Sequence, residues 1–183
     1  MSTSYSTLLK LALPTQGELS GTWGTVINEN ITNMVEEAIA GFKTVNTWSG
    51  NAATLSTANG TTAEARAAIL NLTDSSTSLS GAANLVCPTL TKTYLIKNGT
   101  AQTVTLKTSS GSGIAVPTGK SMWLYCDGTN VVEGVNHIAG ALTVAGAITG
   151  SSTLQGTTIT ATTAVVPDAS GGADLGTTSL EWG

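Results

Sequence analysis

The chain has 183 residues and a formal net charge of −4, and charged side chains make up only 10% of it. This length fits one ordinary domain or two very small ones. The chain has no surplus of basic residues, which argues against nucleic acid as a partner. No apolar run approaches the ~20 residues that a membrane-spanning helix needs, and residues 1–5 lack the basic segment of a signal peptide.

The N-terminal segment, residues 1–41, is predicted to contain a strand, a loop and a helix. Residues 5–13 are an apolar run that indicates a short strand or an extended arm. After a glycine-rich loop, Asn28 is a plausible N-cap and Gly41 a plausible stop, which predicts a helix near residues 29–40. Its apolar side chains recur at spacings of three, four and seven, as on one helix face: Ile27, Ile31, Met34, Val35, Ala38 and Ile39.

Residues 42–81 are predicted to be a linker that contains a second short helix. The first part is rich in Asn, Thr, Ser and Gly around Trp48, a composition typical of loops. Thr61 and Glu64 then match a capping box ahead of an alanine-rich run, which predicts a helix from there to Leu70. The polar stretch 73–81 is the expected domain boundary.

Residues 82–136 are predicted to form a small antiparallel β-sandwich or barrel. The dipeptides at 98–99 (Asn-Gly) and 127–128 (Asp-Gly) favour hairpin turns. Within 120–126, Met122, Leu124 and Cys126 alternate with two aromatic residues, and apolar residues on both faces indicate a central strand. The strand-like runs are 84–87, 92–97, 102–108, 114–116, 120–126 and 130–133.

Residues 137–183 are predicted to be a slender β fibre built from three copies of the chain. Short runs of apolar residues alternate with Thr and are interrupted by Gly, so each strand has one thin apolar face. Such a segment needs neighbouring copies to bury that face. The candidate trimer-interface residues are Leu142, Val144, Ile148, Leu154 and Ile159.

The sequence shows no motif that supports an enzyme, a cofactor or a metal site. Residues 117–121 end like a phosphate-binding loop, but the required first glycine is Ile114 and a strand follows, so a β-turn is the better interpretation. His137 is the only histidine and is expected to be exposed; a metal-binding ring of three copies in a trimer is a weaker alternative. Cys87 and Cys126 are expected to be reduced, buried thiols, although a disulfide stays possible.

Three stretches carry a resemblance to a known group of proteins. Residues 11–41, with Leu-Ala-Leu-Pro at 11–14, Gly-Thr-Trp-Gly at 21–24 and Glu-Glu-Ala-Ile-Ala-Gly at 36–41, resemble the N-terminus of tail-fibre and related virion proteins of marine bacteriophages, especially cyanophages. Residues 94–130 look like a β domain that follows this N-terminus, and residues 173–182 are similar to a linker motif common in phage fibres.

The resemblance implies a structural virion protein, assembled in the host cytoplasm. Its N-terminus would dock to the tail or to adaptor proteins, and its C-terminal part would project toward the host as a homotrimer. It also implies that a host-receptor-binding part lies beyond this chain. The tail-docking candidates are Trp23, Ile27, Ile31, Met34 and Val35, which alternatively pack within their own trimer.

Other functions stay open on the sequence alone. A neck or collar fibre differs from a tail fibre only in its place on the particle. A surface adhesin or carbohydrate-binding module is the rival from another class, and it requires exposed aromatic side chains on one sheet face. Tyr94, Trp123 and Tyr125 are the residues available for that. Taken together, the expected fold is mainly β, with two short helices near the N-terminus and a sandwich or barrel followed by a trimeric fibre.

Overall fold

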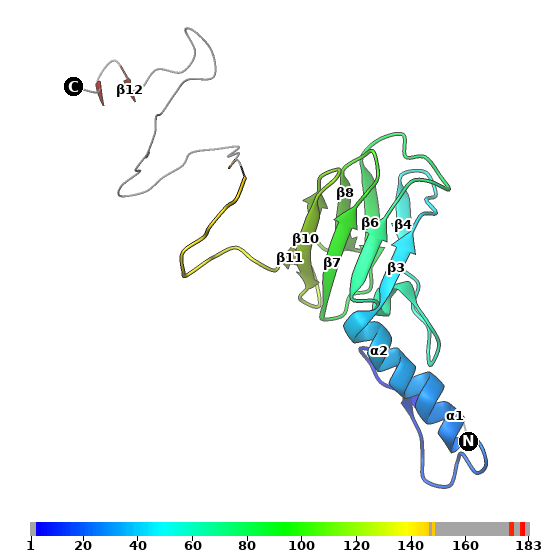
Figure 1. Ribbon diagram of the computed structural model, residues 1–183. Helices are drawn as coiled ribbons and strands as arrows, with labels where there is room; N and C mark the ends of the chain where they lie inside the picture. Colours follow the sequence, from blue (N-terminus) through cyan, green and yellow to red (C-terminus); the bar gives the residue numbers. More distant parts are fainter. Residues whose placement is uncertain (1–2, 147, 149–175, 178–179, 182–183) are drawn as a thin grey trace. The chain divides into compact units, whose positions relative to one another are not determined.

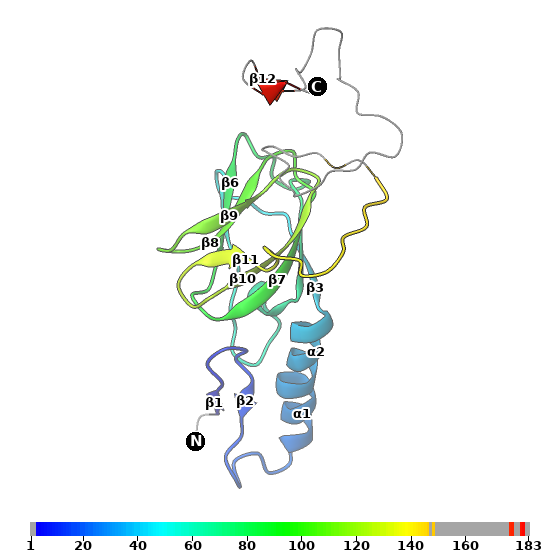
Figure 2. The same ribbon diagram turned by 90° about the vertical axis from the view of Figure 1, so that its left-hand side faces the viewer.

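The computed structural model describes residues 3–146 and 148, and two short paired strands, β12 (Gly176–Thr177) and β13 (Leu180–Glu181). Met1–Gly140 form one compact unit and Ala141–Gly183 a second. The first unit is mainly β: two sheets enclose a shared core, and one long helix extends from an end of them (Figures 1 and 2). No described helix is long and apolar enough to cross a membrane.

The two sheets are mixed, with parallel strands at one side and antiparallel strands at the other. The larger has the order β11-β10-β7-β5-β3 and the smaller β4-β6-β8-β9. Their strands are β3 (Phe42–Val45), β4 (Ala52–Thr54), β5 (Ile69–Leu72), β6 (Ala83–Cys87), β7 (Lys92–Asn98), β8 (Val104–Thr108), β9 (Gly113–Val116), β10 (Ser121–Cys126) and β11 (Val131–Glu133).

From β3 to β8 the chain crosses from one sheet to the other after every strand. As a result β3, β5 and β7 run parallel in one sheet, and β4, β6 and β8 run parallel in the other. This winding resembles a flattened β-helix, and antiparallel β9, β10 and β11 complete its far end. Within residues 82–136, three of the four strand pairs are antiparallel as predicted, and only the β6–β8 pair is parallel. Strands β3 to β11 form two sheets rather than a closed barrel.

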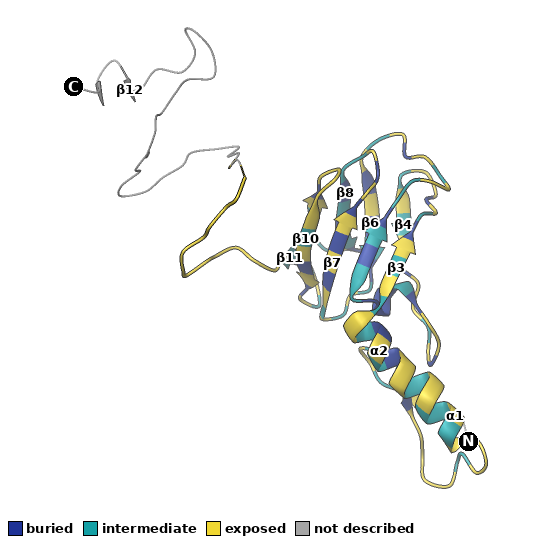
Figure 3. Cartoon of the chain, in the orientation of Figure 1, coloured by how far each residue is buried: buried dark blue, intermediate teal, exposed yellow. Residues whose placement is uncertain are grey.

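The core lies between the sheets because each strand alternates inward apolar residues with outward ones. Leu70, Leu85, Ile96, Leu106 and Leu124 are each at most 1% exposed and come from both sheets. Figure 3 shows the alternation along β7, where exposed and buried positions follow one another. The six strand-like runs predicted for residues 82–136 are all confirmed as strands, with shifts of at most two residues at their ends.

The predicted helix exists but begins earlier than expected. It runs through α1 (Trp23–Ile27), a π-helical stretch (Asn28–Thr32) and α2 (Asn33–Ala40). Asn28 is therefore inside the helix, not its N-cap, since the amides of Trp23 and Val26 already bond the carbonyls of Leu19 and Thr22. Gly41 ends the helix as predicted, with an extended backbone of φ −64° and ψ 132°.

The second predicted helix is wrong. Only Glu64–Arg66 form a single 3₁₀ turn, and the chain then enters strand β5. The capping residue Glu64 is used differently: its carboxylate accepts from the amide of Ser56 at 3.0 Å, and its own amide donates to the Ser56 hydroxyl at 3.2 Å. These two hydrogen bonds close the loop between residues 56 and 64, and the chain enters strand β5 shortly after it.

Residues 42–81 are not a linker, because they supply strands to both sheets. β3 and β5 form one side of the larger sheet, and β4 is the edge strand of the smaller one. Trp48, in the connection between β3 and β4, is only 3% exposed and its indole N–H donates to the carbonyl of Thr73 at 2.8 Å. Trp48 is therefore part of the hydrophobic core between the two sheets.

The predicted turns have mixed outcomes. Residues 4–13 form a small antiparallel hairpin of β1 (Ser4–Tyr5) and β2 (Ala12–Leu13), rather than the single strand or extended arm that was predicted. Asp127 and Gly128 (φ 101°) do connect the antiparallel strands β10 and β11. Asn98, however, does not begin a hairpin, since β7 and β8 belong to different sheets; its buried amide instead donates to the carbonyls of Gln102 and Val116.

Candidate functional site: the outer face of the larger sheet

A continuous apolar row crosses the outer face of the five-stranded sheet. In the strand register, Phe42 of β3 pairs with Ile69 of β5, Ile69 pairs with Leu95 of β7, and Leu95 pairs with Trp123 of β10. Register partners in adjacent strands lie on the same face. At about 4.8 Å between strands, the row extends roughly 15 Å. We call these four residues the apolar row.

The apolar row is open to solvent in the single chain. Trp123 is 59% exposed, Phe42 55% and Leu95 36%, while Ile69 is half-buried between its neighbours. Tyr125, two positions after Trp123 on the same face, is 41% exposed. Large contiguous apolar patches of this kind mark sites of interaction on folded proteins.

A polar row runs beside the apolar one. Two residues further along β3, β5 and β7, and two residues earlier on antiparallel β10, the register brings together Thr44, Asn71, Lys97 and Ser121. The outer face is therefore divided into an apolar stripe and a polar stripe at right angles to the strands. Such a division favours a partner that is itself amphipathic and approaches in a defined orientation.

Of the three aromatic residues that the sequence offered for an exposed sheet face, only two are exposed. Tyr94, one of three possible surface aromatics, is 1% exposed and its hydroxyl donates to the carbonyl of Ala65 at 3.2 Å. Trp123 and Tyr125 are on the surface, so β10 is buried on one face only. The sequence predicted burial of both faces, which was wrong. Phe42 was missed because the Asn- and Thr-rich stretch that it begins was interpreted as a linker, and Ile69 was missed because it was assigned to the second predicted helix.

The tail-docking candidates divide into surface and core residues. Trp23 is 67% exposed and, with Ile27, lines a groove of about 410 Å³ beside the loop from Pro14 to Ser20. Ile31 and Val35 are half-buried, and Met34 is 3% exposed against the guanidinium of Arg66. Met34 is thus a core residue. Exposed Trp23 and half-buried Ile27 are the two ends of α1, which lies at the projecting end of the helix (Figure 2).

The trimer-interface candidates lie in the second unit. Within the chain, Leu142, Val144 and Ile148 are exposed, at 66%, 41% and 73%. Leu154 and Ile159 lie outside the described residues. His137 is exposed, which was the expected state for this residue.

The two thiols are free and buried on facing sheets, Cys87 on β6 and Cys126 on β10. Burial, the proximity of Cys126 and a hydrogen bond with it raise the pKa of Cys87 to about 12. Burial also raises the pKa of Tyr94, which lies beside both thiols. A thiol that stays protonated is a weak nucleophile, so Cys87 acts as a core residue, and Cys126 is buried in the same core.

In the part of the chain that the structure describes, no three His, Cys, Asp or Glu side chains gather as metal ligands would. No protein-family model, curated protein or solved structure matches the chain.

Proposed function

We propose that this chain is a structural component of a bacteriophage tail: a homotrimeric fibre whose N-terminus docks to the tail and whose C-terminal part projects toward the host. The observation that carries the self-association is the apolar row, Phe42–Ile69–Leu95–Trp123, which is open to solvent in the isolated chain. A second copy would cover it. The projecting helix supports tail docking, because α1 lies at its end far from the two sheets (Figure 2) and begins with Trp23, which is 67% exposed.

Self-association is favoured by the apolar surface that the single chain leaves exposed to solvent along the apolar row. Specific interfaces bury about 800 Å² on each partner, and exposed aromatic side chains at their centre contribute most of the binding energy. Trp123 and Phe42 are both more than half exposed on one flat sheet face. Covering apolar surface stabilises an assembly by about 25 cal/mol per Å² before the entropic cost of association.

The solution mass of the full chain, measured by light scattering, tests the proposal. We expect about three times 18.4 kDa, and we expect Leu95→Lys to lower the mass, because it places a charge at the centre of the row. A matched control is Lys107→Met, on β8 in the other sheet, which should leave the trimer intact. A monomeric wild-type chain at every concentration would overturn the homotrimer.

Carbohydrate binding is the second candidate, because Trp123 and Tyr125 are both exposed on one sheet face, as that function requires. The polar row beside them supplies hydroxyl, amide and ammonium groups that can bond a sugar. A glycan-array signal from the full chain that Trp123→Ala abolishes would favour this function. A trimer without glycan signal would favour the fibre.

A further inference from the structure

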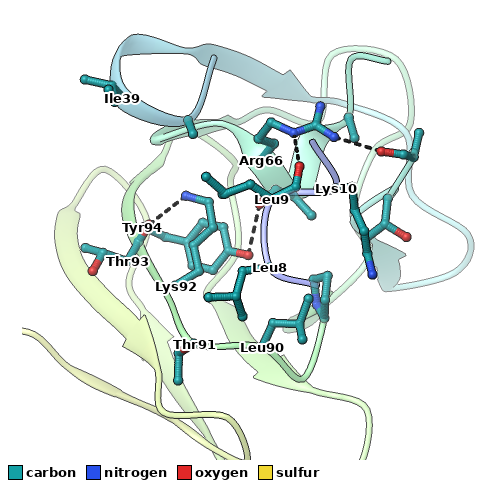
Figure 4. Close-up of a pocket in the computed structure, with 16 residues that line it drawn as sticks. Leu8, Leu9, Lys10, Ile39, Arg66, Leu90, Thr91, Lys92, Thr93 and Tyr94 are labelled. Carbon is teal, nitrogen blue, oxygen red and sulfur yellow. Dashed lines mark hydrogen bonds between the residues drawn. The ribbon is translucent and has the colours of Figure 1, made fainter. Parts of the chain in front are cut away.

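A cavity of about 380 Å³ lies where the N-terminal hairpin meets the end of α2 and the start of β7 (Figure 4). Leu8 and Leu9 come from the hairpin loop, Ile39 from α2, and Leu90 from the loop before β7. The volume is in the range of small-molecule pockets, which are concave, mostly apolar and carry a few polar groups. This cavity is separate from the apolar row and does not depend on the proposed function.

The walls of the cavity are aliphatic and partly open to solvent. Leu8 is 52% exposed and Ile39 74%, although both are large apolar side chains. Leu90 and Pro88 complete the wall on the β7 side. An aliphatic ligand would cover apolar surface here that the fold itself leaves in water.

The charged side chains that line the cavity are all basic. Three of the chain's seven Lys and Arg residues line it, namely Lys10, Arg66 and Lys92, and its described lining includes no Asp or Glu. Arg66 is already neutralised by Glu37 at 2.8 Å. Lys10 and Lys92 form no ion pair with a carboxylate of the described residues. In a chain of net charge −4, this is a local surplus of positive charge beside an apolar wall.

Lys92 is held in place with donor capacity to spare. Its ammonium donates to the carbonyls of Ala67 and Thr93, both at 3.0 Å, and lies 4.6 Å from the centre of the Tyr94 ring. An ammonium has three N–H donors, and the described residues take up two. Burial lowers the pKa of Lys92 to about 8, so the group is still mainly charged at neutral pH, and no carboxylate of the described residues pairs with it.

We infer that this cavity binds an aliphatic carboxylate, whose chain lies against Leu8, Ile39 and Leu90 and whose carboxylate pairs with Lys92. The aliphatic part matches the walls and the anion matches the unpaired cation. A neutral aliphatic ligand would leave Lys92 without a counter-ion, and a purely polar anion would leave the walls in water.

Calorimetric titration of the full chain with octanoate tests the inference, with octanamide as a neutral ligand of the same length. We expect saturable octanoate binding and at least tenfold weaker octanamide binding, since a charge-assisted hydrogen bond is about twice as strong as a neutral one. Lys92→Met should lower octanoate affinity to that of octanamide, and Lys92→Arg should restore the preference for the anion. Lys120→Met, at an exposed turn, is the matched control and should bind as wild type.

Ile39→Asp is a second variant, at an exposed position where folding should tolerate the change. We expect it to abolish octanoate binding by repulsion at the mouth. The inference is overturned if wild type shows no saturable binding, if octanamide binds equally well, or if Lys92→Met has no effect. It is also overturned if octanoate does not bind and Ile39→Asp lowers the light-scattering mass, because the cavity is then a contact between copies. The wild-type mass separately reports on the proposed trimer.

Discussion

The guanidinium of Arg66 lies 2.8 Å from the carboxylate of Glu37 and joins the helix to the turn before β5. Both side chains are buried, at 3% and 8% exposure. Arg66 also donates to the carbonyls of Leu9, Ala58 and Thr61, so a single side chain ties the N-terminal hairpin, the helix and the 58–66 loop together. Arginine suits this position because its planar fork has five donors.

Removal of Arg66 should therefore destabilise the unit strongly. We expect Arg66→Met to lower the free energy of unfolding by about 3–5 kcal/mol, because it leaves a buried carboxylate without its partner. Lys43, 3.2 Å from the other Glu37 oxygen but not in hydrogen-bonding geometry, offers only partial compensation. Urea denaturation measures the change. The double variant Arg66→Met with Glu37→Gln should recover part of the loss, and a single-variant effect below about 1 kcal/mol would contradict a structural role for the pair.

Two glycine substitutions should have opposite effects. Gly24 is inside α1, and a Cβ there would meet no atom within 4 Å, so Gly24→Ala should stabilise the chain by about 1 kcal/mol through helix propensity. A Cβ at Gly111 would overlap the carbonyl oxygen of Thr129 and the hydroxyl of Thr108. Gly111→Ala should therefore destabilise by about 1–3 kcal/mol. Thermal unfolding of both variants checks the sign, and equal effects would show that the helix or the loop is packed differently.

How far the sequence predicts this fold depends on how local the signal is. The Asp127–Gly128 turn joins strands that are neighbours in sequence, so turn chemistry and strand alternation together were enough to find β10 and β11. The apolar spacing predicted the helix but not its first residue. The N-cap residue Thr22 makes no side-chain capping hydrogen bond, and backbone hydrogen bonds to the carbonyls of Leu19 and Thr22 extend the helix toward the N-terminus.

The parallel half of the fold had no such signal. Ile69 pairs with Leu95 and Phe42 pairs with Ile69, each about 26 residues apart in sequence. Parallel pairing of this kind carries no turn motif, and the polar composition around Phe42 resembled a linker. Trp123 and Tyr125 could be identified in the sequence as aromatic residues. The apolar row that Trp123 completes could not, because it is assembled across strands whose pairing the sequence does not signal.

Alkaline pH should weaken the core through Cys87. Its pKa is raised from 9.0 in the unfolded chain to about 12 in the folded one. The thiol therefore contributes stability that is fully present below pH 9 and is lost as the pH rises from 9 to 12, since the unfolded state then binds fewer protons. We expect the free energy of unfolding of wild type to fall over this range.

Cys87→Ala should make that decline shallower. Part of it should remain above pH 10, because the pKa of Tyr94 is also raised by burial, and between pH 8 and 10.5 the lowered pKa of Lys92 acts in the opposite direction. Urea unfolding of both proteins at a series of pH values isolates the thiol as the difference. An identical pH profile for the variant and wild type would exclude this contribution.

Tryptophan fluorescence can separate the two exposed surfaces. Trp123 is 59% exposed on the apolar row and Trp23 is 67% exposed on the helix, while Trp48 is 3% exposed in the core. In dilute solution, acrylamide should quench both exposed indoles. As the protein concentration rises and copies associate through the apolar row, Trp123 should become protected, because burial at the centre of an interface excludes the quencher.

Trp123→Phe and Trp23→Phe distinguish the contributions. Because Trp182 lies outside the described residues, both variants are made in a Trp182→Phe background. We expect the concentration-dependent protection to disappear in Trp123→Phe, whose remaining exposed indole among the described residues is Trp23, and to persist in Trp23→Phe. The reverse pattern would show that copies associate through the helix rather than the sheet, and would move the proposed trimer contact from the apolar row to the groove beside Trp23 and Ile27. Protection in neither variant at concentrations where light scattering reports a trimer would place the contact away from both indoles, and the second unit, where Leu142, Val144 and Ile148 are exposed, would be the next surface to test.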